Sequence, residues 1–355
     1  MENKVDLKKI LYIAVHEINQ GWGAEHFVNK GFSDSGIKTV CIDYRKRRKG
    51  IVNLIKKVES FDYFLLQRGD YFPLQILKAI NRPKIFWASE LVSRNRDQDR
   101  LFKSNLFDHV FVRTNACKDT IVSNGWLKED RISVLLSGFD PDTHYPVEQI
   151  KKDIDVLFIG NVLNRRKKWL NEIGKHCALS IAEGVFGEDM VKLINRSKII
   201  LNIHSENFLD TETRVFEVLG CKGFLLSEKL SAENPFISNT HLVECEDVKD
   251  MVDKISFYLK NEDQIEKIAE QGYMEAFAKH TYLKRAEYIR DIFSLYSPMN
   301  SNEAIDRKMI HTAKQESFLL FLKVYCMEYI IIIKKRVKQY IKRMNIFRKH
   351  FDTIV

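Results

Sequence analysis

The sequence predicts an α/β protein of two domains, each built on a parallel sheet with helices on both faces. Short apolar segments alternate with helical patterns along most of the 355 residues, which is typical of βαβ units. The chain is long enough for two domains of ordinary size. One segment rich in turn-forming residues, from Gly138 to Pro146, interrupts the alternation, and the pattern then restarts.

Six short apolar segments are predicted as strands of the first domain, with helices between them. The predicted strands are residues 10–15, 39–43, 63–66, 85–88, 110–112 and 133–136, and the predicted helices include 24–35, 72–80 and 116–124. The first domain is expected to cover residues 1–140, followed by a linker at 141–153.

The second domain is expected to cover residues 154–297 and to be Rossmann-like as well. Its predicted strands are 156–159, 179–182, 199–203, 225–227 and 242–244, and its predicted helices are 166–176, 188–196, 248–259 and 262–279. Two such domains facing one another would form a cleft, and ligands bind beyond the carboxyl ends of parallel strands.

The charge and the cysteines exclude several classes of protein. Eight basic residues and one acidic residue lie in 331–355, so this segment carries most of the net charge of +9. A nucleic-acid-binding body is therefore not indicated. The six cysteines form no C-x-x-C or Cys/His cluster, which favours reduced thiols in a cytoplasmic protein over a zinc site or disulfides. No signal-peptide pattern is recognisable at the N-terminus.

The segment 198–226 contains the clearest binding pattern. A buried strand ends in polar residues, and the helix that follows carries Arg214 near its start and Glu217 on the same face. Free backbone N–H groups, the helix dipole and a guanidinium group suit a phosphate, and Glu217 could accept hydrogen bonds from a ribose. The alternative is an ordinary strand–helix–strand unit with a surface ion pair.

A second basic loop precedes another helix of the same domain. Gly160 and Asn161 end a strand and lead to the run Arg165-Arg166-Lys167-Lys168. A solvated basic surface would explain this run alone. Two arginine-bearing loops at neighbouring strand ends favour a shared anion site, so Arg165, Arg166 and Arg214 are predicted to surround one diphosphate.

In the first domain the polar residues that follow strands are candidates for acid–base chemistry. His16, Glu17 and the turn from Gly21 to Gly23 follow the first predicted strand, and Glu90 follows the fourth. Transfer to a hydroxyl acceptor needs a group that takes its proton, which suits His16, Glu17 or Glu90. A helix cap or a salt-bridged loop residue is the alternative for each. The glycines allow close approach of backbone to a substrate.

Two D-x-D sequences could in principle hold a divalent metal. One lies at Asp140–Asp142 in the linker and the other at Asp97–Asp99 in a polar helical stretch. Neither follows a strand, so neither is predicted to bind a metal bridging a diphosphate. No metal and no cofactor is expected.

Several ordered motifs of the second half resemble the glycosyl transferases group 1 family, and within it the spore-maturation CgeB-like branch. They are FIGN followed by RRKKW, then VFGEDMVKLINRSKIILNIHS, TRVFEVLGCKGFLLSEK, HLVECEDVKDMVDKISFYL and HTYLKRAEYI. The resemblance covers roughly residues 150 to 293, and the linker SGFDPDTHYP resembles the connection between domains in the same superfamily.

The resemblance implies a GT-B fold that holds a nucleoside diphosphate sugar mainly on the second domain. By the family's pattern Arg214 meets the diphosphate and Glu217 the ribose, Arg165 or Arg166 is a second phosphate contact, and His204 and Ser205 line the cleft. Retaining members often carry a second glutamate eight positions before the one that matches Glu217. Here that position is Leu209, with Asp210 adjacent but out of register.

The C-terminal segment 298–355 is predicted to be a basic amphipathic helix. Residues 318–333 are apolar except for Lys323 and Glu328, too short and too charged to favour a membrane span. From Ile330 onward apolar residues recur at helical spacing among lysines and arginines, a pattern typical of binding to an anionic membrane surface. Packing on the body or on a partner protein is the alternative, and nucleic acid is not an expected partner.

The function predicted from these features is a glycosyltransferase, peripherally bound to the inner face of the cytoplasmic membrane. It would move a sugar from a nucleoside diphosphate donor to a cell-envelope glycan or lipid-linked acceptor, without a metal. Two alternatives remain open: a sugar-nucleotide epimerase on the same fold, and a non-catalytic protein that binds nucleotide sugars.

Overall fold

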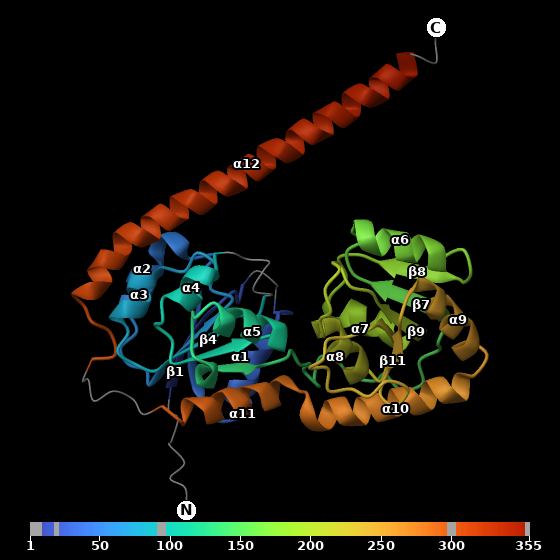
Figure 1. Ribbon diagram of the computed structural model, residues 1–355, viewed down its shortest axis with the longest axis horizontal. Coiled ribbons are helices and arrows are strands. Elements are labelled where there is room, and N and C mark those ends of the chain that lie inside the picture. The colour runs from blue at the N-terminus through green and yellow to red at the C-terminus, as the bar shows by residue number, and fades with distance from the viewer. Residues whose placement is uncertain (1–8, 18–20, 91–96, 297–302, 352–355) are drawn as a thin grey trace, which may run out of the picture.

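The computed structural model describes residues 9–17, 21–90, 97–296 and 303–351, and in the last helix the side chains up to Val337 except at position 335. These residues form two α/β lobes side by side and one long helix that leaves the first lobe (Figure 1). The basic and apolar side chains predicted beyond Val337 lie outside the described side chains.

The first lobe contains a six-stranded parallel sheet in the order β2-β1-β3-β4-β5-β6. Its strands are β1 (Lys9–Ala14), β2 (Lys38–Asp43), β3 (Tyr63–Gln67), β4 (Lys84–Trp87), β5 (His109–Val112) and β6 (Ile132–Val134). Its helices are α1 (Ala24–Asp34), α2 (Ile51–Lys56), α3 (Leu74–Ala79), α4 (Asp99–Lys103) and α5 (Asn115–Ser123), with short 3-10 turns at Arg48–Gly50 and Glu129–Arg131.

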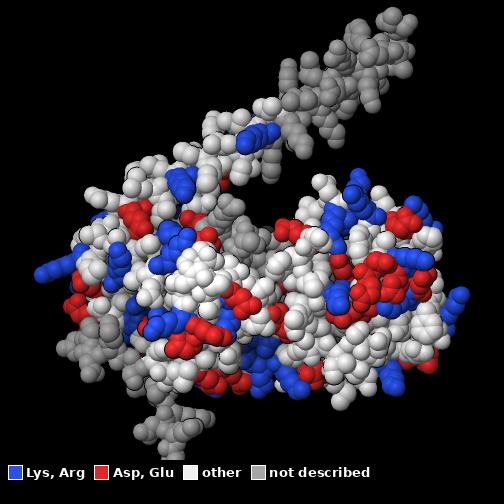
Figure 2. All heavy atoms as spheres, in the orientation of Figure 1, with Lys and Arg blue, Asp and Glu red and all other residues white. Residues whose placement is uncertain are grey.

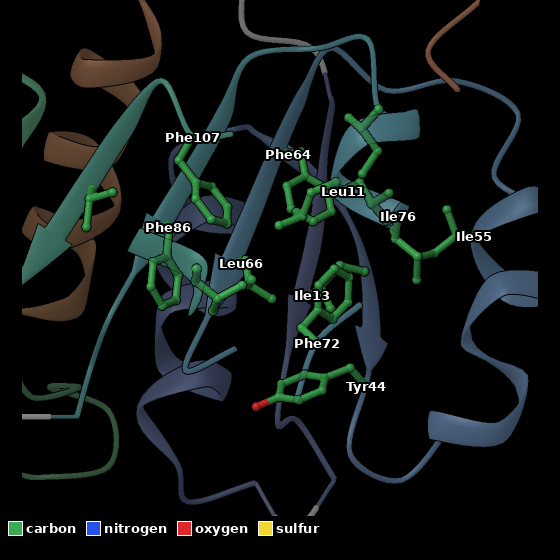
Figure 3. Close-up of a cluster of buried hydrophobic side chains, with 14 of the residues drawn as sticks. Leu11, Ile13, Tyr44, Ile55, Phe64, Leu66, Phe72, Ile76, Phe86 and Phe107 are labelled. Atoms are coloured by element: carbon green, nitrogen blue, oxygen red, sulfur yellow. The ribbon is translucent and has the colours of Figure 1, made fainter. Parts of the chain in front are cut away.

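Apolar runs fix the central strands of this sheet. Every residue of β3 is buried, as expected for a strand that is covered on both faces. On one face Leu11, Phe64, Leu66 and Phe86 pack with Phe72 (Figure 3). The polar residues that follow these strands are consequently gathered at one edge of the lobe.

The second lobe contains a five-stranded parallel sheet in the order β11-β10-β9-β7-β8. Its strands are β7 (Ile154–Ile159), β8 (Leu179–Ala182), β9 (Ser197–Asn202), β10 (Leu225–Glu228) and β11 (Val243–Cys245). Its helices are α6 (Asn164–Ile173), α7 (Gly187–Asn195), α8 (Thr213–Gly220), α9 (Val248–Tyr258) and α10 (Glu262–Lys279).

The helix α11 (Tyr282–Phe293) returns to the first lobe. Tyr282, Ala286, Ile289 and Phe293 join the buried cluster beneath β1 and β3, and α11 packs along α1. The predicted second domain, 154–297, included this helix, whereas its apolar face belongs to the core of the first lobe. Helical periodicity identifies a buried face but does not say which sheet it covers.

Two segments connect the lobes, and they run side by side. The linker residue Phe139 accepts a hydrogen bond from the backbone N–H of Tyr282 (2.9 Å) and donates one to the carbonyl of His280 (3.3 Å). The buried ring of Phe139 packs against Gly220 at the end of α8, where a Cβ would have no room. The linker is therefore anchored to the second lobe at the point where α11 leaves it.

The last helix, α12 (Met309–Phe351), begins on the first lobe and then leaves it (Figure 1). Ile310, Ala313 and Val324 are buried, and Glu316 accepts hydrogen bonds from the backbone N–H groups of Leu74 and Gln75. The early part of the predicted tail is thus packed on the body. No helix in the described part of the chain is both long enough and apolar enough to span a membrane.

Replacement of Gly31 by alanine tests the packing of α11 on α1. A Cβ at this position would lie 2.7 Å from the carbonyl oxygen of Tyr282. Although alanine favours a helix by about 1 kcal/mol, overpacking costs more, so Gly31→Ala is expected to lower the free energy of unfolding by about 1–2 kcal/mol. Gly50→Ala, whose Cβ meets no atom within 4 Å, is the control in urea denaturation. Equal stability of the two variants would contradict this packing.

Candidate functional site

A cleft of about 1080 Å³ opens between the lobes, at the carboxyl ends of the strands of the second sheet. Most of its lining belongs to the second lobe, and the first lobe contributes Trp22 and Arg113. The lining residues of the second lobe are Phe158–Asn161, Arg166, Gly184–Phe186, Asp189, Lys192, Leu193, Arg196, Asn202, Asp210, Glu212, Thr213, Arg214 and Glu217. Loops before α6, α7 and α8 all reach it, so the starts of three helices border one hollow.

Arg166 and Arg214 both line this cleft, as predicted. Arg166 donates hydrogen bonds to the carbonyls of Ile203 (2.7 Å) and Asn161 (3.3 Å) and lies 3.4 Å from Glu212. Arg214 forms an ion pair with Glu217 at 2.9 Å. Both guanidinium groups are held by contacts within the second lobe. Arg166 lies in the first turn of α6 and Arg214 in the first turn of α8.

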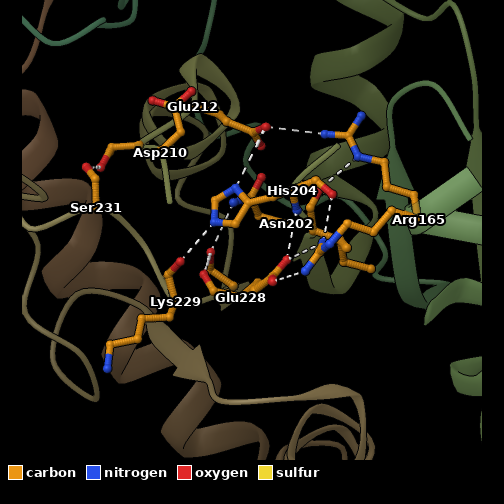
Figure 4. A network of polar contacts seen from close by, with 12 residues as sticks. Arg165, Asn202, His204, Asp210, Glu212, Glu228, Lys229 and Ser231 are labelled. Carbon is orange, nitrogen blue, oxygen red and sulfur yellow. Dashed lines mark hydrogen bonds and ion pairs between the residues drawn. The ribbon is translucent and has the colours of Figure 1, made fainter. Parts of the chain in front are cut away.

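Arg165 does not share the cleft with these two arginines. Its guanidinium group bonds both carboxylate oxygens of Glu228 and the carbonyl of His204, and it lies over the ring of Trp169 (Figure 4). Consecutive residues of a helix point about 100° apart. Arg165 and Arg166 thus leave α6 in different directions. Because Arg165 is absent from the cleft lining, the prediction that 165, 166 and 214 surround one diphosphate is corrected for Arg165.

Glu217 lies at the inner end of the cleft, one helical turn from Arg214. Its carboxylate is also 3.7 Å from Nε2 of His144, a buried linker residue. Burial lowers the pKa of His144 and outweighs the Glu217 carboxylate, which raises it. Glu217 therefore faces a neutral imidazole and one arginine, and its oxygens border the cleft as possible acceptors.

His204 is buried behind the cleft and does not line it. Nε2 lies 2.8 Å from the carbonyl of Lys229, and Nδ1 lies 3.9 Å from Glu212 (Figure 4). Burial lowers the pKa of His204. The Glu212 carboxylate and the carbonyl of Lys229 together raise it by more than burial lowers it, so that the net shift is upward. Burial raises the pKa of Glu212, but the neighbouring His204 and Arg166 lower it by more, so that the net shift is downward. Ser205 follows in the same loop and is likewise absent from the lining.

The only cleft cation contributed by the first lobe, within the described residues, is Arg113. It crosses to the second lobe and pairs with Asp210 at 2.8 Å, while Nη1 lies 3.4 Å from the carbonyl of Ser89. Leu209, the position where retaining family members often carry a glutamate, is exposed. The neighbouring Asp210 is buried in the cleft wall. Burial raises the pKa of Asp210 and outweighs the lowering effect of Arg113. The sequence offered no signal for Arg113, because only the fold brings it opposite Asp210.

A second contact between the lobes involves the glycine turn of the first domain. Gly21 has a positive φ of 88°, and Gly23 is the N-cap of α1. Between them Trp22 packs so closely on Gly187, the first residue of α7, that a Cβ there would lie 2.5 Å from the indole ring. The predicted glycine turn thus presents an aromatic side chain to the cleft.

The three predicted acid–base residues follow strands of the first sheet, but none lines the cleft around Arg214. Glu17 pairs with Lys46 (2.6 Å) and Arg47 (3.3 Å). Glu90 pairs with Arg68 at 3.0 Å. His16 lies 3.4 Å from the carbonyl of Tyr12, and burial lowers its pKa.

The D-x-D carboxylates make local ion pairs. Asp140 and Asp142 each lie 2.8 Å from Lys30, and Asp97 pairs with Arg100 at 3.2 Å. Among the residues that the structure describes, no group of three or more His, Cys, Asp or Glu side chains is arranged to hold a metal.

Comparison with known proteins agrees with this architecture. Residues 144–291 match the model of a family described as glycosyl transferase-like. No curated protein sequence matches the chain. The matched residues comprise most of the second lobe together with the end of the linker.

Solved structures of other proteins share the two-lobed fold over about four fifths of the chain. Sucrose-phosphate synthase from Thermosynechococcus elongatus has a TM-score of 0.61 at 9% identity, with 81% of this chain and 100% of that one covered. A glycosyltransferase from Rickettsia africae has 0.55 at 14%, covering 84% and 100%. Anabaena HepE in complex with UDP and glucose has 0.58 at 12%, covering 81% and 100%. The chain therefore has the two-lobed GT-B architecture of these enzymes.

Replacement of His204 by glutamine tests the charge of the buried histidine. A histidine whose pKa is raised on folding stabilises the protein below its unfolded-state pKa of about 6.5, and this contribution is lost as the pH rises through the folded-state value. We expect His204→Gln to lower the melting temperature most below about pH 6.5, and progressively less above it. His176→Gln, which removes an exposed imidazole, is the control. A difference that grows with rising pH would contradict the assignment.

Replacement of Gly187 by alanine tests the contact with Trp22. Both Gly187 and Gly184 have positive φ, 59° and 68°, but a Cβ at Gly184 meets no atom within 4 Å. Both variants carry the backbone strain of about 1 kcal/mol, and only Gly187→Ala also displaces the indole. We expect it to be the less stable by about 1–3 kcal/mol in chemical denaturation. The excess should vanish when Trp22 is also replaced by alanine; an excess that persists would locate the clash elsewhere.

Proposed function

We propose that the protein is a glycosyltransferase that uses a nucleoside diphosphate sugar. The observation that carries the proposal is the convergence of Arg166, Arg214 and the start of α8 in one cleft of a glycosyl transferase-like domain. Guanidinium groups and free N–H groups at a helix N-terminus are donors suited to a diphosphate. The HepE structures with UDP and with UDP-glucose support the same donor class for this fold.

In the proposed reaction the bond between the sugar anomeric carbon and the donor phosphate breaks, and a bond to an acceptor oxygen forms. The diphosphate gains negative charge as it leaves, which Arg166 and Arg214 stabilise because they are fixed before the donor arrives. The acceptor hydroxyl loses its proton. Glu217 accepts hydrogen bonds from the ribose, as the resemblance implies, and the cleft walls exclude water.

The proton of the acceptor requires a base on the side of the first lobe. Of the three predicted residues, Glu17 is held by two cations, whereas His16 is kept neutral by burial, which lowers its pKa. A neutral imidazole can accept a proton at neutral pH. We propose His16 as the base, with Glu90 as the alternative; both follow strands of the first sheet outside the lining of the donor cleft, so the proposal requires the acceptor to extend from one site to the other. The metal-free mechanism remains part of the proposal, with arginines supplying the positive charge.

We further propose a cell-envelope glycan or lipid-linked acceptor and a peripheral position on the inner face of the membrane. The support is the surface of α12, where Tyr329, Val337 and residues 330–333 are about half exposed and cations follow. Exposed apolar surface beside cations suits an anionic membrane interface. Membership of the CgeB-like branch rests on the ordered motifs alone.

Binding of nucleotide sugars by single-arginine variants tests the proposal. A charge-assisted hydrogen bond contributes about 1.5–3 kcal/mol, so Arg166→Gln and Arg214→Ala are expected to raise the Kd of the best donor by about tenfold to 100-fold. Lys168→Ala removes an exposed charge from α6, the helix of Arg166, and is the control. The donor is chosen by thermal shift from a panel of uridine, guanosine, adenosine and thymidine diphosphate sugars.

The outcome separates the three functions. Release of nucleoside diphosphate with transfer to an acceptor supports the transferase, and an altered sugar without any acceptor would identify an epimerase. Tight binding without turnover under varied acceptors would identify a binding protein. If no nucleotide sugar of the panel binds, or if Arg214→Ala binds as the wild type does, the proposal is wrong.

A further inference from the structure

A second groove, of about 720 Å³, lies between α12 and the first lobe. One wall is formed by loops that follow β1, β2 and β3, and includes Glu17, Asp70 and the cations Arg45, Lys46, Arg48 and Lys49. The groove therefore lies at the carboxyl edge of the first sheet, where ligands of parallel sheets bind. It is separate from the cleft that holds Arg166 and Arg214.

The cationic wall belongs to a run of five consecutive basic residues, 45–49. Asp70 pairs with Arg45 (2.5 Å) and Arg48 (3.3 Å), and Glu17 pairs with Lys46 and Arg47. Lys49 forms no ion pair with a described residue and is exposed. Although Glu328 of α12 also borders the groove, positive charge is in excess along this wall. An anion suits it.

Arg48 fixes this basic loop against α12. Its Nε and Nη1 are buried without a hydrogen-bond partner in the described chain, as is Oγ of Ser317 on α12. Both residues border a cavity of about 10 Å³, which suits one water molecule and not a phosphate. The Arg48 guanidinium and Nζ of Lys323 both lie over the ring of Tyr71, at 5.7 and 5.5 Å. Lys46 and Lys49 are left at the open groove.

The opposite wall is the apolar side of α12. Phe321, Val324, Tyr325, Met327 and Ile331 line it, and the rings of Phe321 and Tyr325 stack with centroids 6.1 Å apart. A groove with one cationic wall and one aliphatic and aromatic wall matches a molecule with a phosphate joined to a hydrocarbon chain. A free sugar phosphate would leave the apolar wall without a partner.

At the end of the groove α12 exposes an uninterrupted apolar run that begins beside the lining residue Ile331. Ile330, Ile331, Ile332 and Ile333 are between 44% and 52% exposed, and this part of the helix extends away from both lobes (Figure 1). In the space-filling view the described part of α12 is mostly uncharged, whereas blue basic side chains gather on the lobe beneath it (Figure 2). An apolar helix surface next to cations suits the boundary between lipid chains and headgroups.

We propose that this groove binds the phosphate end of a lipid-linked acceptor, with α12 lying in the membrane interface and Lys46 and Lys49 contacting the phosphate. The inference rests on the proposed function and defines its acceptor class as a glycan joined to a lipid through phosphate. The hydrocarbon chain follows α12 into the bilayer. The sugar end points along the carboxyl edge of the first sheet, where His16 and Glu17 follow β1.

The experiment compares vesicle binding of the full chain by sedimentation. Phosphatidylcholine vesicles containing a polyprenyl phosphate are set against vesicles with phosphatidylglycerol at equal surface charge. We expect the full chain to bind the polyprenyl phosphate vesicles about tenfold more tightly. Each basic side chain near an anionic headgroup contributes about 1 kcal/mol of binding free energy, so the Lys46→Gln/Lys49→Gln variant should lose this preference. Lys260→Gln, which removes an exposed lysine of the second lobe, should keep the preference.

Three results would overturn the inference. Equal binding to both vesicles would show a general membrane contact, and abolition of the preference by inorganic phosphate at equal phosphate concentration would show a free-anion site. A preference that survives in the double variant would place the lipid elsewhere. Thermal shifts with nucleotide sugars are measured on the same variants and should be unchanged. If the wild-type protein bound no nucleotide sugar, the proposed transferase function would be wrong. The vesicle experiment would still show whether the groove binds a lipid phosphate.

Discussion

The attachment of Arg166 is the interaction on which the geometry of the cleft depends. Its guanidinium group bonds the carbonyls that follow β7 and β9 and lies beside Glu212 ahead of α8. One side chain thereby ties together the loops of two neighbouring strands and a helix start. These bonds hold the guanidinium group in position at the wall of the cleft. The Arg214–Glu217 pair completes the same wall.

The architecture could be predicted because parallel strands are apolar on both faces and short. The predicted strand at 179–182 and the predicted helix at 262–279 coincide with β8 and α10, and most other elements shift by one or two residues at their ends. The return of α11 to the first lobe could not be predicted. An amphipathic helix shows a buried face in its sequence, but the sheet that covers this face is determined by long-range packing.

The site was predictable only where local spacing carries the information. Arg214 and Glu217 are one turn apart on a single helix, so their shared face follows from periodicity. Arg165 and Arg166 lie on the same helix, and their different directions also follow from periodicity. The Arg113–Asp210 pair joins residues from two lobes, and no local pattern reports such a contact. The basic run at 45–49 is obvious in the sequence, but its meaning depends on α12.

The paired connection between the lobes has a mechanical consequence. The linker at Phe139 and the strand-like segment at Thr281 form a two-chain bridge, and a bridge of two hydrogen-bonded chains resists twisting much more than one flexible chain would. We therefore expect the lobes to move relative to one another mainly by bending across this bridge. Opening for substrate exchange would then separate Trp22 from Gly187 and Arg113 from Asp210 in one concerted rotation, with each pair returning to the same register on closure.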